Sequence, residues 1–145
     1  MSTESGPQPQ PTPEERTRRL VERGEALDEG EARNILWEED EATHVRSLDR
    51  REAIAAIDRD LADPETDEFD QYELRYRKAI FETAETPDEI ELLLYVYLTD
   101  IEATDRGMER LDRKAAEVAR RIGEERARGL ETTYRTRMQQ LMSEY

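Results

Sequence analysis

Glu41 and His44 are the residues whose type and spacing come closest to a known metal-binding pattern. Residues three positions apart share one face of a helix, and helical bundles that bind paired iron or manganese use the Glu-x-x-His spacing twice. His44 is the only histidine in the sequence, so a complete site could form only across a dimer. We therefore predict no metal site and interpret His44 as a solvated residue on a helix surface.

The acidic stretch from Asp58 to Asp70 could bind calcium specifically only if its spacing matched a calcium loop. Such a loop has oxygen ligands at positions 1, 3, 5 and 12 and a glycine at position 6. Counted from Asp58, positions 5 and 12 are Ala62 and Phe69, and position 6 is Asp63. The pattern does not match, and we expect only loose association of cations with this stretch.

The sequence lacks the residue combinations from which enzymes most often build catalytic sites. It contains no cysteine and no second histidine, so the usual pairs of nucleophile and base are missing. It also contains no Gly-rich phosphate loop and no Gly-x-Ser-x-Gly motif. With 37 acidic side chains, some carboxylate pair at a glycosidase-like separation is unavoidable and indicates nothing. We predict no catalytic residue, no cofactor and no enzymatic activity.

Residues 106–145 are locally basic in an otherwise acidic chain. They carry 10 basic and 7 acidic residues, net +3, whereas residues 1–105 carry 12 and 30, net −18. A basic helix face could contact nucleic acid or an acidic protein surface, although pairs of Glu and Arg four positions apart, such as Glu131 and Arg135, also stabilise an isolated helix. The candidate basic face consists of Arg106, Arg110, Arg113, Lys114, Arg120 and Arg121.

The end of the chain is apolar along one predicted helix face. Methionine and tyrosine are common at adaptable contact surfaces, so we predict contact with a partner protein, and packing within the chain is the alternative. The candidate partner-contact residues are Leu130, Tyr134, Met138, Leu141, Met142 and Tyr145.

Helical periodicity and capping signals predict an all-α fold of five to six helices in a small bundle. Residues 1–13 are expected to form an extended Pro-rich arm, residues 14–105 an acidic helical domain, and residues 106–145 one long amphipathic helix used for oligomerisation or docking. Capping boxes at Thr12, Asp49 and Thr86 predict helix starts, and one helix is expected over residues 50–62. The most apolar segment, from Ile90 to Ile101, is the expected buried centre. Gly107 leaves open whether the last two helices form one rod or a hairpin.

The acidic composition is typical of proteins that work in concentrated salt. The net charge is −15, and only Lys78 and Lys114 are lysines while the other 20 cations are arginines. Concentrated salt screens carboxylate repulsion over roughly 3 Å at 1 M and strengthens apolar burial. The sequence has no signal peptide pattern and its longest apolar run is too short to cross a bilayer. We therefore expect a protein of the cytoplasm or of an assembled particle, with no membrane contact.

These features together favour a non-enzymatic structural or assembly subunit adapted to high salt. A connector or adaptor component of a virus particle is one example of such a subunit. The expected partners are protein subunits, either further copies of the chain or other proteins. The alternative is a nucleic-acid-associated regulatory protein that uses the basic C-terminal helix.

Overall fold

The computed structural model describes residues 9–144, and this part of the chain contains seven α-helices and no strand. The predicted all-α class is therefore confirmed, while the predicted number of five to six helices is too low. Residues 1–8 of the predicted arm and Tyr145 lie outside the described residues. The helices are α1 Pro13–Glu22, α2 Glu29–Ser47, α3 Arg50–Ala62, α4 Glu68–Thr83, α5 Pro87–Ile101, α6 Asp105–Ile122 and α7 Glu124–Glu144.

Side-chain caps set the starts of most helices. The hydroxyl of Thr12 and the carboxylate of Asp49 accept hydrogen bonds from backbone N–H groups three residues later, at 3.1 and 2.9 Å. Thr86 caps α5 in the same way at 3.2 Å. Each bond satisfies an N–H group that has no partner inside the helix. All three predicted helix starts are confirmed.

Gly123 divides the C-terminal region, so the prediction of one long helix over residues 106–145 is wrong. Its φ of +109° lies in the region that side-chain-bearing residues avoid, and α6 ends there before α7 begins at Glu124. The regular apolar spacing of this region continues across the break, which is why periodicity alone did not reveal it.

The last part of the chain also does not form one rod, because α5 ends at Ile101 and α6 packs back against it. The break precedes Gly107, which lies inside α6 close to the side chain of Glu102. Thr104 caps α6 by accepting a hydrogen bond from the N–H of Gly107 at 3.0 Å. The hairpin alternative is therefore the correct one.

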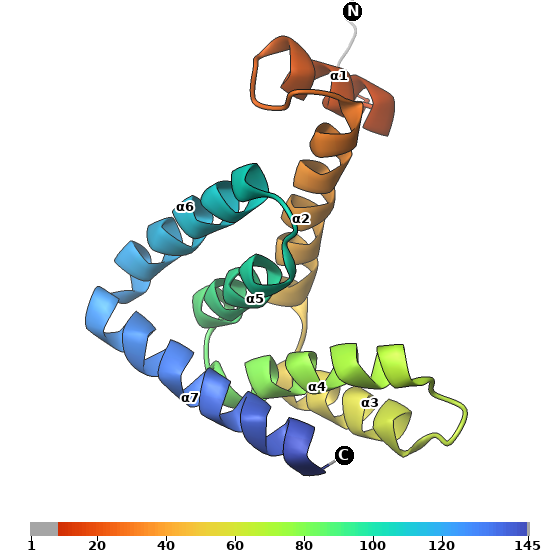
Figure 1. Ribbon diagram of the computed structural model, residues 1–145, viewed down its shortest axis with the longest axis vertical. Coiled ribbons are helices and arrows are strands. Elements are labelled where there is room, and N and C mark those ends of the chain that lie inside the picture. Colours follow the sequence, from red (N-terminus) through yellow and green to blue (C-terminus); the bar gives the residue numbers. More distant parts are fainter. Residues whose placement is uncertain (1–8, 145) are drawn as a thin grey trace, which may run out of the picture. The chain divides into compact units, whose positions relative to one another are not determined.

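The chain consists of two compact units, and each has its own cluster of buried apolar side chains. Unit 1 comprises residues 1–41, and unit 2 comprises residues 42–145 and includes the end of α2. In unit 2 every residue from Leu92 to Leu98 is buried, because α4, α6 and α7 all pack against α5. Figure 1 shows α6 and α7 as two arms of an open V with α5 between them. The expected central helix is thus the centre of unit 2.

Unit 1 is built from α1 and the first part of α2. Among its described residues, Ala26, Ala32 and Ile35 form the buried apolar cluster, with Leu20 and Val21 packed against them. An ion pair of 3.3 Å joins the guanidinium of Arg16 on α1 to the carboxylate of Asp40 on α2. This core is small for a folded unit.

Replacing Gly123 with alanine should lower the free energy of unfolding by about 1 to 3 kcal/mol, because alanine is strained at a positive φ. The control is Gly129→Ala inside α7, where an added Cβ would meet nothing within 4 Å. That change should raise the same free energy by about 0.5 to 1 kcal/mol through helix propensity. Urea unfolding followed by circular dichroism measures both, and equal effects would contradict the special conformation of Gly123.

Candidate functional site

The structure places the candidate partner-contact residues in two different environments. Leu130 and Leu141 are buried in the core of unit 2, so packing within the chain accounts for them. Tyr134 belongs to the same core and Met138 packs against it, but these two residues and Met142 also line a cleft on unit 2. Tyr145 lies outside the described residues. Contact with a partner stays a prediction.

This cleft, which we call the Tyr134 cleft, lies among α4, the end of α5 and α7. Its volume is about 540 Å³, which is within the usual range for ligand pockets. Sequence reasoning missed five of its eight residues. Two of them lie on α4 and α5 and reach the cleft only through folding, and the other three lie on α7 beside the predicted residues. The cleft is lined by Tyr76, Asp100, Tyr134, Arg135, Met138, Gln139, Met142 and Ser143.

The hydroxyl of Tyr134 is the most unusual group in the cleft. Tyr134 is only 1% exposed, and within the described residues its hydroxyl has no hydrogen-bond partner. A buried hydroxyl without a partner destabilises a fold by roughly 1 to 3 kcal/mol. Burial also raises the pKa of Tyr134, so this side chain stays neutral. Phenylalanine would fill the same space without that cost.

Tyr76 also lines the cleft, and its hydroxyl already has a hydrogen-bond partner. Its hydroxyl lies 2.7 Å from the hydroxyl of Tyr72, and its ring centroid lies 4.4 Å from that of Tyr97. Burial, followed by the hydrogen bond with Tyr72, raises the pKa of Tyr76. This part of the lining is therefore an uncharged aromatic surface.

The two charged residues of the lining neutralise each other. Arg135 donates two hydrogen bonds to the carboxylate of Asp100, at 2.9 and 3.4 Å, and a third to Glu131 at 3.1 Å. The hydrogen bond to Asp100 raises the pKa of Arg135 still further, so the pair stays ionised. The Tyr134 cleft therefore suits an uncharged group that is mostly apolar and carries one hydrogen-bonding atom.

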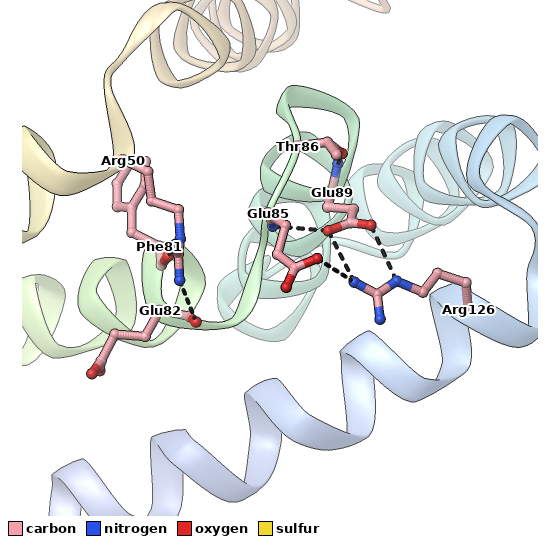
Figure 2. Close-up of polar contacts among 7 residues, drawn as sticks. All are labelled: Arg50, Phe81, Glu82, Glu85, Thr86, Glu89 and Arg126. Atoms are coloured by element: carbon pink, nitrogen blue, oxygen red, sulfur yellow. Dashed lines mark hydrogen bonds and ion pairs between the residues drawn. The ribbon is translucent and has the colours of Figure 1, made fainter.

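A buried carboxylate fixes α7, and with it the cleft, to the turn between α4 and α5. Glu89 has an 8% exposed side chain that accepts hydrogen bonds from the backbone N–H of Glu85 at 2.8 Å and from Arg126 at 3.2 Å. Figure 2 shows the Arg126 guanidinium reaching Glu85 as well as Glu89. The start of α5 and the start of α7 are thus held by the same side chain.

Two further arginines fix the end of α4. Arg50 donates to the backbone carbonyls of Phe81 and Glu82, which are among the carbonyls left without partners at a helix end (Figure 2). Arg137 on α7 binds the carboxylate of Glu82 at 3.0 and 3.2 Å. These contacts hold α4 and α7 at the two sides of the cleft.

The six residues of the candidate basic face all belong to α6. Arg121 lies 3.2 Å from the carboxylate of Glu91 on α5 and 3.6 Å from that of Asp88. Arg46 binds the same two carboxylates at 2.8 and 2.5 Å. Arg121 is therefore part of a network that holds α5, whereas Arg113 and Arg120 are exposed. Nucleic-acid contact by this face stays a prediction.

Among residues 9–144, no three His, Cys, Asp or Glu side chains are placed to share a metal ion. His44 is exposed. No described helix combines the length and apolar character that a membrane crossing requires.

Comparison with known proteins does not identify a family for this chain. No protein-family model, curated protein or solved structure matches it. A proposal for its function therefore rests on its own residues.

Replacing Glu89 with alanine should lower the free energy of unfolding by about 2 kcal/mol, because the Glu85 N–H loses its partner and the Arg126 contact is lost. The matched control is Glu85→Ala, since Glu85 binds the same arginine but is 71% exposed. The control should change that free energy by less than about 0.5 kcal/mol. Denaturant unfolding at constant KCl measures both, and a similar loss in the two variants would contradict the role of burial.

Stability should fall as the pH rises above about 10. Folded Tyr134 and Tyr76 retain their protons because burial raises their pKa values, while an unfolded tyrosine ionises near pH 10. Each of the two tyrosines should lower the free energy of unfolding by about 1.4 kcal/mol per pH unit above pH 10, and should have no such effect below pH 10. Tyr134→Phe should remove one contribution and stabilise the isolated chain at neutral pH by about 1 kcal/mol. Urea unfolding from pH 7 to 11 measures both, and an unchanged pH dependence would contradict the assignment.

Proposed function

We propose that this chain is a non-enzymatic structural subunit whose copies assemble into a larger complex in concentrated salt. The observation that supports the proposal is the incomplete core of unit 1. Only Ala26, Ala32 and Ile35 form its buried apolar cluster in the described residues. Leu27 and Trp37 remain 69% and 52% exposed.

A unit of this size rarely folds stably on so small a core. Below about 40 residues, disulfides, bound metals or association with other chains usually supply the missing stability. The chain has no cysteine, so disulfides are excluded. Covering Trp37 in an assembly would provide apolar burial that unit 1 does not provide for itself.

Unit 1 is strongly acidic, so association of its copies should depend on salt. Residues 1–41 carry 12 acidic and 5 basic residues, net −7. Copies of such a surface repel one another in dilute buffer, whereas 1 M salt limits charge interactions to roughly 3 Å and strengthens apolar contacts. A virus-particle connector or adaptor is one complex in which a subunit of this kind would serve.

In multimolar KCl the full chain should form a complex larger than a single chain of 17.0 kDa. Trp37 is the only tryptophan, so its fluorescence reports directly on the exposed surface of unit 1. As the protein concentration rises at constant KCl, we expect the Trp37 emission to shift to shorter wavelength and its quenching by acrylamide to decrease. Light scattering coupled to size-exclusion chromatography measures the mass in parallel.

Lowering the KCl concentration should shift the same sample towards single chains, because repulsion between acidic surfaces returns. A constant mass of one chain at every protein concentration in multimolar KCl would contradict the proposal. So would association that strengthens as salt is removed, because that dependence indicates attraction between opposite charges.

A further inference from the structure

We propose that copies of the chain associate head to tail, with Trp37 of one copy inserted into the Tyr134 cleft of the next copy. This inference rests on the proposed self-assembly and names the contact that produces it. The contact joins two different surfaces of the molecule, one from unit 1 and the other from unit 2.

The chemistry of an indole ring matches what the cleft lacks. A buried tryptophan needs an acceptor for its N–H group, and the hydroxyl oxygen of Tyr134 has no partner within the described residues. The rest of the ring is apolar and would lie against Tyr76 and against the thioethers of Met138 and Met142. Thioether sulfur and aromatic rings attract each other when they are in contact.

The proposed contact requires side chains around the Tyr134 hydroxyl to move. The Tyr134 hydroxyl is covered in the isolated chain, and Met138 and Met142 are half-buried residues of the same lining. Methionine is unbranched and repacks readily around a ligand. The cleft volume of about 540 Å³ leaves room for one large side chain.

Charge favours this head-to-tail contact over a symmetric contact between two copies of unit 1. A symmetric contact would bring two surfaces of net −7 together, and exposed Glu39 and Asp40 lie two and three positions after Trp37 on α2. Helix α7, which forms one side of the cleft, carries four acidic and four basic residues and so has no net charge. The head-to-tail contact therefore avoids the like-charge repulsion that disfavours the symmetric one.

A contact between two different surfaces leaves one free surface of each kind at the ends of every complex. Such a contact repeats until the complex closes into a ring or extends as a filament. The assembled state also removes the cost of the unpaired Tyr134 hydroxyl, since the indole N–H becomes its partner.

Complementation between two variants tests this contact in multimolar KCl. Trp37→Ala removes the inserted ring but keeps the cleft, and Met142→Glu blocks the cleft but keeps the ring. Each variant alone should have the mass of one chain. Mixed in equal amounts they should form a complex of two chains and no larger, with the remaining Trp37 protected from acrylamide.

Control variants separate the contact from a loss of folding. Phe69→Ala removes an exposed aromatic residue outside the cleft and should assemble like the original chain. Ser143→Arg blocks the cleft from an exposed position, and it replaces Met142→Glu if circular dichroism shows that the latter has lost helix. Tyr134→Phe should weaken association about tenfold, which is the effect of one hydrogen bond of about 1.4 kcal/mol.

The outcomes distinguish this inference from the proposed function. If the original chain stays monomeric, the proposed self-assembly is wrong, and this contact is wrong with it. If the original chain assembles but Trp37→Ala assembles equally well, or the two variants fail to complement each other, only the head-to-tail contact is wrong. A two-chain complex that forms only in the mixture supports both.

Discussion

The buried carboxylate of Glu89 is the contact on which the arrangement of unit 2 depends. It accepts hydrogen bonds from the backbone at the α4–α5 turn and from Arg126 on α7, so it fixes the start of α5 and the start of α7 together. The consecutive buried residues of α5 are the core against which α4, α6 and α7 pack. The Tyr134 cleft lies among α4, α5 and α7, so Glu89 helps to hold the helices that form it.

Arginine links the helices of a chain that has few large aliphatic residues. Arg137 binds Glu82, Arg135 binds Asp100, and Arg50 binds carbonyls at the end of α4. The planar guanidinium donates several hydrogen bonds at fixed angles, which the ammonium group of a lysine cannot reproduce. The strong excess of arginine over lysine in the sequence thus has a structural use in addition to any adaptation to salt.

Local signals in the sequence were sufficient to predict the helix starts but not the cleft. The side chains of Thr12, Asp49 and Thr86 accept hydrogen bonds from backbone N–H groups three residues later, so nearby sequence is sufficient to predict these caps. Gly123 breaks the C-terminal helix without disturbing its apolar spacing, and the break was missed for that reason. Tyr76, Asp100 and Tyr134 meet only through packing of three helices, which no sequence period records.

Unit 1 and the Tyr134 cleft each have a deficit that a contact with another chain would remove. In the part of the chain that the structure describes, unit 1 exposes the indole of Trp37 beside a small core, and the cleft holds a buried hydroxyl without a partner. Each deficit alone has ordinary explanations, such as a weakly folded terminus or tolerated strain. Their chemistry is nevertheless complementary, since one is an exposed donor on an apolar ring and the other an unpaired acceptor in an apolar cleft. A single interface that covers the indole and pairs the hydroxyl would explain both features together. The stability that unit 1 does not gain from its own core would then come from the assembled state.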